Sequence, residues 1–303
     1  MSTANSPRPL VVYAWLAVGV ASVGAAAIFI RLADTEPLTV ASYRLVLGAL
    51  FVAIPTLLRA RDGLRGIQRS DMALLGLSGL FLAGHIAAWI ASLSFTTVAS
   101  SVLLVTTAPV FVALASRFVL RERVGRITVL AVALSLAGGV VLAGGDWDNS
   151  GRHLLGDGLA VVGAVTVAGY MLAGRSARGH VNNLPYVTVV YTVAGVALLV
   201  AALSSGAPML GLPMESYFWI FMAALLPQAI GHTLLNWSLA HVSATNVSLA
   251  VRGEPIIATL LAIVVLGEVP AWTVLPGGAL IMAGVYVAIR AEASEGAGVT
   301  NGQ

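Results

Sequence analysis

The sequence predicts an all-α integral membrane protein of ten transmembrane helices, built as two inverted five-helix repeats with both termini in the cytoplasm. Three observations lead to this prediction: the apolar composition, the placement of the arginines and an internal repeat. The chain has 303 residues, of which 58% are hydrophobic and only 10% are charged. Soluble domains carry about 25% charged residues, so the composition excludes a soluble protein. The lipid bilayer is therefore an expected partner.

Two residue types are missing, and each absence excludes classes of chemistry. The chain has no cysteine, which excludes disulfides, thiolate metal sites and cysteine nucleophiles. All 16 basic residues are arginines, and the missing lysine excludes a P-loop ATPase, a retinal pump and a pyridoxal phosphate enzyme. We expect a non-enzyme with no catalytic residue, no cofactor and no metal site.

Ten apolar stretches follow one another along the chain. Each has about 20 residues, enough for a helix to cross a hydrocarbon core of about 30 Å. The alternation of barrel strands is missing, so the spans are predicted to be helices. They cover residues 11–32, 37–58, 71–92, 97–119, 125–144, 155–175, 184–205, 216–240, 243–266 and 270–290. The polar segment 1–10 predicts a cytoplasmic N-terminus, and the small polar residues of 291–303 predict a disordered cytoplasmic tail.

The arginines predict the orientation of these spans. With the N-terminus placed inside, twelve arginines fall in cytoplasmic segments and only Arg31 and Arg152 fall in outer loops. Such an excess on one side is the positive-inside signal. It also explains the basic net charge without nucleic acid, which is not an expected partner. The remaining two arginines, Arg44 and Arg252, lie within predicted spans.

An internal repeat relates the two halves of the chain. Residues 91–144 align without a gap onto 237–290, and 14 of the 54 pairs are identical. The identical pairs include Pro109 with Pro255, Glu122 with Glu268, and Ala137-Gly138 with Ala283-Gly284. A paired proline and a paired glutamate at one offset match by chance much less often than apolar residues do.

The repeat unit contains five spans, at 11–145 and 155–290, joined by an outer loop at 146–154. Five is an odd number, so the second copy is inserted upside down relative to the first. Inverted repeats are the architecture of secondary transporters that work by alternating access, with the substrate near the midplane where the repeats meet.

The sequence TAPVFVALASRFVLRERV…LAGGVVL and its copy GEPIIATLLAIVVLGEVP…IMAGVYV resemble the EamA repeat of the drug/metabolite transporter superfamily. The resemblance covers nearly the whole chain. It implies ten helices, cytoplasmic termini, a multi-pass protein of a bacterial inner membrane and export of small metabolites. The bacterial branch includes amino-acid exporters, aromatic amino-acid exporters among them. The chain departs from its own repeat at Arg121 and Arg123, where the copy has Gly267 and Val269, as a switch from inside to outside requires.

Glu254 is the best candidate for a transport residue. It lies near the middle of the ninth span, between Gly253 and Pro255. A charge at the bilayer centre costs about 2.5–3.5 kcal/mol, which makes such residues functional candidates. Proline disfavours helical geometry at the residue before it, so we expect the helix to be kinked or opened here. We expect Glu254 to bind a proton or a substrate amine, with Gly253, Pro255 and the paired Pro109 as hinges. The alternative is a fixed ion pair or a protonated, hydrogen-bonded carboxyl.

Arg44 and Arg252 are candidates for a substrate carboxylate, because a guanidinium binds carboxylates with a two-pronged fork. Arg44 lies seven residues into the second span. Arg252 precedes Glu254 by two residues, about 200° round the helix, so the two share a face only if the kink turns one of them. The alternative is a structural pair with a backbone carbonyl or with Glu254.

Polar residues in two further spans are candidates for a cavity lining. Gln228, His232 and Asn236 follow one another at intervals of four residues, which predicts one polar stripe on the eighth helix. His85 lies one turn before Trp89 in the third span. Among the six tryptophans, Trp89 is the one that we expect to form part of a cavity wall. The alternative for all of them is polar contact between helices.

The favoured function is a secondary transporter that exports small metabolites, with aromatic or neutral amino acids as the favoured substrates. Cationic drugs and nucleotide sugars are the alternative substrates. From other classes, a channel and an intramembrane serine protease are the alternatives. The protease rests on the string Gly76-Leu77-Ser78-Gly79 with His85 or His232 as the base. A four-residue match is weak evidence, and an inverted repeat gives no reason for proteolysis.

Overall fold

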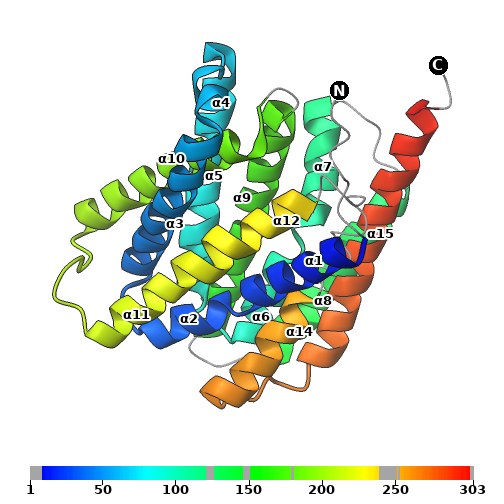
Figure 1. Cartoon of the computed structure of the whole chain (residues 1–303). Coiled ribbons are helices and arrows are strands. Elements are labelled where there is room, and N and C mark those ends of the chain that lie inside the picture. Colours follow the sequence, from blue (N-terminus) through cyan, green and yellow to red (C-terminus); the bar gives the residue numbers. More distant parts are fainter. Residues whose placement is uncertain are drawn as a thin grey trace.

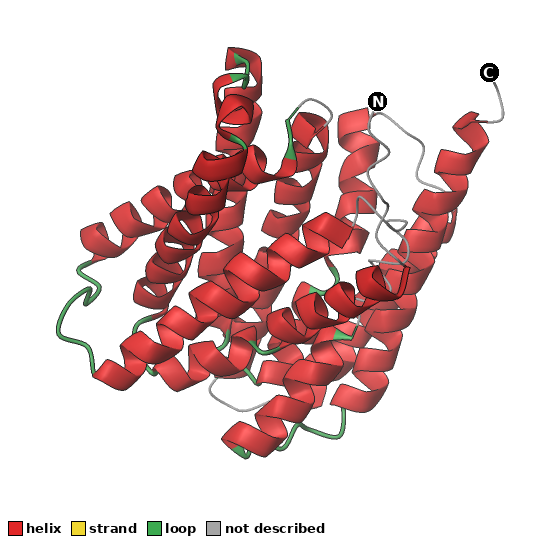
Figure 2. Ribbon diagram, in the orientation of Figure 1, coloured by secondary structure: helices red, strands yellow, loops and turns green. Residues whose placement is uncertain are grey.

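The computed structural model describes residues 9–120, 126–145, 151–178, 181–238, 251 and 253–300, and in these ranges the chain is helical with no strand (Figure 2). The helices form one bundle. In Figure 1, α4 (Arg61–Arg65) and the C-terminal end of α15 (Val274–Thr300) lie at the top, and the connection between α14 (Glu254–Leu261) and α15 lies at the bottom.

Within the described residues, six helices are long and apolar enough to cross a membrane, and four shorter apolar helices lie where the sequence predicts the fourth, fifth, ninth and tenth spans. Those of the first half are α1 (Pro9–Gly24) with α2 (Ala26–Ala33), α3 (Pro37–Arg59), α5 (Arg69–Ser92), α6 (Val98–Val105) with α7 (Ala108–Leu120), and α8 (Arg126–Gly145). Those of the second half are α9 (Arg152–Arg178), α10 (Asn183–Ser205), α11 (Met214–Ala223) with η1 (Ala224–Gly231) and α12 (His232–Ser238), α14 with η2 (Ala262–Leu266), and α15.

The contacts between helices follow the symmetry of the repeat. The second span packs on the seventh (α3 on α10), the fourth on the ninth (α6 on α14) and the fifth on the tenth (α8 on α15). The first span contacts the eighth, and the third contacts the sixth (α1 on η1, α5 on α9), which are again exchanged by the repeat. Pairs of this kind arise when two copies are related by a two-fold axis in the membrane plane.

Two paired glycines make the closest of these contacts possible. A Cβ at Gly138 of α8 would lie 2.6 Å from the Gly277 carbonyl oxygen, and a Cβ at Gly284 of α15 would lie 2.7 Å from the Ala131 carbonyl oxygen. Both glycines therefore let the backbone of one helix approach the other, as small residues do in membrane helix pairs. The repeat thus preserves the small residue on both sides of the α8–α15 contact.

The fourth and ninth spans are interrupted next to their paired prolines. In the fourth, Thr106 and Thr107 form a turn between α6 and α7, and their hydroxyls donate hydrogen bonds to the Leu103 and Leu104 carbonyls. In the ninth, the turn is at Gly253 and α14 begins at Glu254, with the proline in its first turn. Proline fits the first turn of a helix because its missing N–H is not needed there.

The eighth span differs from the predicted α-helix. Residues 224–231 form the π-helix η1, with Pro227 inside it. Proline removes one backbone donor and clashes with the preceding turn, and a π-helix with bonds from i to i+5 accommodates it. The four-residue spacing of Gln228 and His232 was predicted to place them on one stripe. Gln228 lies in the π-helical turn and His232 opens the following α12, so the stripe itself stays a prediction.

The C-terminal segment also differs from its expectation. The backbone of α15 is helical as far as Thr300, through most of the segment 291–303 for which the composition predicts disorder. The sequence Ala291-Glu292-Ala293 explains the difference, because alanine and glutamate are strong helix formers and continue a helix that the apolar span has already nucleated.

Candidate functional site

Arg44 forms the centre of the candidate site. It lies on α3 with 1% of its surface exposed. Its Nε donates a hydrogen bond of 3.1 Å to the Gln228 Oε1 of η1, and its guanidinium carbon lies 5.3 Å from the centroid of the Trp89 ring of α5. The Arg44 Nη1 is buried and has no hydrogen-bond partner among the residues that the structure describes. Arg44, Gln228 and Trp89 come together because α3 packs between α5 and η1. The sequence of the second span alone does not predict this contact.

Trp89 is held from its other side by His85. The two rings are stacked, with centroids 6.2 Å apart and planes inclined by 1°. The His85 Nδ1 lies 2.9 Å from the Gly163 carbonyl oxygen of α9. A carbonyl only accepts, so this nitrogen carries the proton and fixes the orientation of the ring. Within the described ranges of the chain, the Trp89 Nε1, like the Arg44 Nη1, is buried without a hydrogen-bond partner.

Gln228 is fixed by partners from two other helices. Its amide accepts from Arg44 and shares a side-chain hydrogen bond with the Tyr191 hydroxyl of α10. It also packs against α3 at Gly48, where an added Cβ would lie 2.7 Å from the Gln228 Cγ. Glycine at this position therefore makes room for the amide one turn after Arg44. Both Gln228 and Tyr191 are 1% exposed.

Glu254 lies near this cluster but does not form an ion pair with Arg44. Arg44 and Glu254 interact electrostatically, as do Arg44 and His232. In the part of the chain that the structure describes, ion pairs within 4.0 Å join Arg31 to Glu268 and Arg65 to Asp62, and neither involves Glu254. Glu254 and His232 are half-buried. The acid at the start of α14 thus lies near a buried cation without neutralising it by direct contact.

The geometry brings two unpaired donors and one acid to the same region. An unsatisfied buried donor costs about 1–3 kcal/mol, so the buried Arg44 Nη1 and the buried indole N–H of the neighbouring Trp89 need a physical reason. An oxyanion with two oxygens is the group that pairs with both. A carboxylate at Glu254 provides the complementary place for a cation. The arrangement is therefore chemically suited to a ligand that carries both charges.

Six of the eight predicted binding residues contribute described side chains to this region: Arg44, His85, Trp89, Gln228, His232 and Glu254. Arg252 and the side chain of Asn236 lie outside the described residues. The sequence did not predict Tyr191 or Gly163, because a tyrosine and a glycine in apolar spans have no pattern that marks them.

Ser78 does not belong to the cluster. It is fully buried, and its hydroxyl lies 2.9 Å from the Tyr186 hydroxyl and 3.4 Å from the Tyr170 carbonyl oxygen. These partners come from α10 and α9, so the Gly-Leu-Ser-Gly string ties α5 to its neighbours. Its contacts are those of a packing residue.

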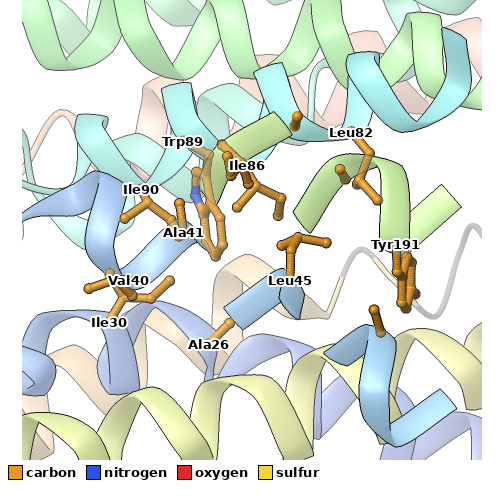
Figure 3. Close-up of a cluster of buried hydrophobic side chains, with 14 of the residues drawn as sticks. Ala26, Ile30, Val40, Ala41, Leu45, Leu82, Ile86, Trp89, Ile90 and Tyr191 are labelled. Carbon is orange, nitrogen blue, oxygen red and sulfur yellow. The ribbon is translucent and has the colours of Figure 1, made fainter. Parts of the chain in front are cut away.

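Apolar side chains surround the cluster. Leu45 and Ile86 lie beside Trp89, and Ile90 extends the same surface along α5 (Figure 3). All belong to one buried core that also includes Tyr191. A ligand bound at Arg44 and Trp89 would therefore place its remaining part against apolar groups.

Comparisons with known proteins identify the family. The model of the EamA-like transporter family matches residues 10–144 and 154–290. An uncharacterized transporter of Archaeoglobus fulgidus is 29% identical over 88% of this chain and 92% of its own length. The uncharacterized transporter YdfC of Bacillus subtilis is 28% identical over 82% of this chain and 80% of its own.

Two further comparisons concern function and fold. A probable terminal-alkyne amino-acid exporter of Streptantibioticus cattleyicolor is 31% identical over 62% of this chain and 63% of its own length. A solved crystal structure of a protein matches 93% of this chain and 97% of its own with a TM-score of 0.64 at 19% identity, which supports the fold alone. With both halves of the chain matched by the family model, the protein belongs to the EamA-like transporter family and is a multi-pass membrane transporter.

Proposed function

We propose that this transporter exports amino acids with neutral or aromatic side chains, by alternating access between its two repeats. The substrate carboxylate binds Arg44 and the Trp89 indole N–H, and the substrate ammonium binds Glu254. The observation that carries the proposal is the buried Arg44, whose Nη1 has no hydrogen-bond partner among the described residues although Glu254 lies within electrostatic range. The amino-acid exporter among the relatives supports the same substrate class.

Each charged group of the site argues against one alternative substrate. A nucleotide sugar brings two phosphates, for which a single arginine beside a carboxylate is a poor partner. A cationic drug would pair with Glu254 but leave the buried Arg44 unsatisfied and repel it. An amino acid satisfies both groups at once, and its side chain fits the apolar surface of Leu45 and Ile86.

The remaining residues of the site position these groups. Gln228 holds the Arg44 Nε, so that the guanidinium presents its other edge to the substrate. His85 holds Trp89 by stacking. His232 lies near enough to Arg44 to respond to its charge, and Asn236 and Arg252 are proposed to line the route beyond the described cluster.

Alternating access uses the interrupted spans. The breaks next to Pro109 and Pro255 lie on α6 and α14, which contact each other, and α14 also contacts α1. Movement at these breaks opens one mouth as it closes the other. Glu254 begins the mobile half-helix, so it exchanges the substrate ammonium for a proton on the return step.

Counterflow in proteoliposomes tests the proposal. Vesicles loaded with unlabelled L-phenylalanine are expected to accumulate labelled L-phenylalanine and L-leucine with saturation. Phenethylamine and 3-phenylpropionate, which each lack one of the two charges, are expected to compete at least about tenfold more weakly, since a charge-assisted hydrogen bond contributes about 1.5–3 kcal/mol.

Arg44→Gln is expected to abolish the exchange. Arg61→Gln is the matched control, because it removes the same charge from an exposed residue of α4. A flat response to a panel of labelled amino acids, with nucleotide sugars or cationic drugs exchanged instead, would overturn the proposal.

A further inference from the structure

Two adjoining cavities of about 250 Å³ each lie at the end of the bundle opposite α4, and together they are called the outer vestibule here. Arg31 and Ser94 line both of them. Asp34 lines the first, and Arg152 and Glu268 line the second. Arg31 and Arg152 are the two arginines that the positive-inside pattern leaves on the outer side. Both therefore lie at one place, which topology does not require.

Arg31 is only partly paired in the outer vestibule. Its Nη2 lies 3.1 Å from the Glu268 Oε2, whereas its buried Nε finds no hydrogen-bond partner in the part of the chain that the structure describes. The second oxygen of Glu268 accepts a hydrogen bond of 2.7 Å from the Val98 backbone N–H at the start of α6. Glu268 thus occupies one edge of a guanidinium that can hold a carboxylate at two positions.

The outer vestibule adjoins the central site through one apolar layer. Val40 lines the vestibule and precedes Arg44 by one turn of α3, a rise of about 6 Å. Ile90 also lines it and follows Trp89 directly on α5. Ile30, Val40 and Ile90 are buried in the same core beside Trp89 (Figure 3). A substrate that leaves Arg44 towards the outside meets Arg31 next.

We propose that the outer vestibule is a second, exit-side binding site for the substrate, in which the substrate carboxylate displaces Glu268 from Arg31. The proposal rests on the proposed function for the identity of the substrate. Asp34, three residues after Arg31 and exposed in the same cavity, binds the substrate ammonium. The vestibule thereby repeats the combination of one arginine and one acid that Arg44 and Glu254 provide in the membrane.

Glu268 makes this site a weak one. It is a tethered carboxylate that competes with the substrate for Arg31, so the substrate binds briefly and is released to the outside. When the substrate leaves, the Arg31–Glu268 pair re-forms between α2 of the first repeat and the α14–α15 connection of the second. The same residues then hold the outer ends of the two repeats together.

Binding of labelled 3-phenylpropionate to the purified full-length protein tests this site. The Arg44→Gln background removes the central carboxylate site, so that the vestibule is measured alone. Adding Glu268→Gln is expected to tighten binding about tenfold, because the competing charge is gone while the amide oxygen still accepts from the Val98 N–H. Adding Arg31→Gln is expected to abolish it, and 3-phenylpropanol, which lacks the carboxylate, is not expected to compete.

Arg65→Gln in the same background is the matched control, since it removes an ion-paired arginine at an exposed position. Binding that survives Arg31→Gln, or an affinity that Glu268→Gln leaves unchanged, would falsify the vestibule site. If the wild-type protein exchanges no amino acid but the Arg31-dependent binding is present, the proposed function fails and the carboxylate site stands. Normal amino-acid exchange with Arg31-independent binding overturns the vestibule site alone.

Discussion

The two helix breaks at Thr106-Thr107 and at Gly253-Glu254 occupy the same place in the two repeats, yet they carry different chemistry. In the first, the threonine hydroxyls bond to the carbonyls that the break leaves free, at 2.7 and 2.6 Å. In the second, the repeat puts Glu254 where the first copy has Ala108. The shared feature is the proline that follows, Pro109 or Pro255.

In the proposed function, the feature that the two breaks share serves the movement of the repeats, and the feature in which they differ serves recognition of the substrate. An inverted repeat needs matched breaks, because the rearrangement that closes one mouth must be repeated upside down at the other. A substrate that is not symmetric needs unlike groups around it. In the proposed function, the first repeat contributes Arg44 and Trp89 from intact helices, and the second contributes the acid from its break.

The largest expected effect comes from removing the chemical difference between the breaks. Glu254→Gln keeps the size of the side chain but loses the charge that the ammonium needs. Export of L-phenylalanine from proteoliposomes is expected to fall about 10- to 100-fold at substrate concentrations below KM, in line with the loss of a charge-assisted hydrogen bond. Glu36→Gln, at an exposed residue before α3, is expected to have no effect. Wild-type rates for Glu254→Gln at both acidic and alkaline pH would show that Glu254 takes no part in substrate or proton binding.

An intermediate effect is expected from the shared prolines. Pro109→Ala and Pro255→Ala each restore a backbone donor and favour a continuous helix. Each is expected to slow exchange about fivefold, which corresponds to about 1 kcal/mol, with the Kd for L-phenylalanine unchanged. Comparing exchange rates with equilibrium binding separates the two contributions. A change in Kd without a change in rate would show that the prolines shape the site and do not act as hinges.

The smallest effect is expected at the capped break. Thr107→Val removes the hydroxyl that bonds to the Leu104 carbonyl while keeping the side-chain volume. The loss is expected to be about 1 kcal/mol of unfolding free energy, with transport unchanged. Thermal unfolding in detergent measures the first quantity and counterflow the second. Lost transport at wild-type stability would mean that this break also takes part in recognition.

The main features of the fold could be predicted from patterns along the chain. The apolar runs, the offset of 146 residues and the prolines predicted the spans, their internal symmetry and the breaks, because each depends on local sequence or on the bilayer. The π-helix at Pro227 was missed, although a proline one residue before Gln228 was a visible signal for it.

The site could be predicted only in its parts. Arg44 and Glu254 were marked by the cost of charge in a bilayer, but their neighbours depend on how separate helices pack. Nothing near Arg44 in the sequence indicates that its Nε meets Gln228, 184 residues away, or that Tyr191 joins them. The stacking of His85 on Trp89 lies within one helix, and its spacing of four residues was readable.

Gly48 has a consequence for how this protein can change by mutation. An alanine there would press its methyl group against the Gln228 side chain, which its hydrogen bonds to Arg44 and Tyr191 prevent from moving aside. Positions 48 and 228 are thus interdependent: a larger residue at the first is tolerated only after a smaller one at the second. Descendants of this chain that reshape the surroundings of Arg44 are expected to change both positions, with the smaller residue at 228 arising before the larger one at 48.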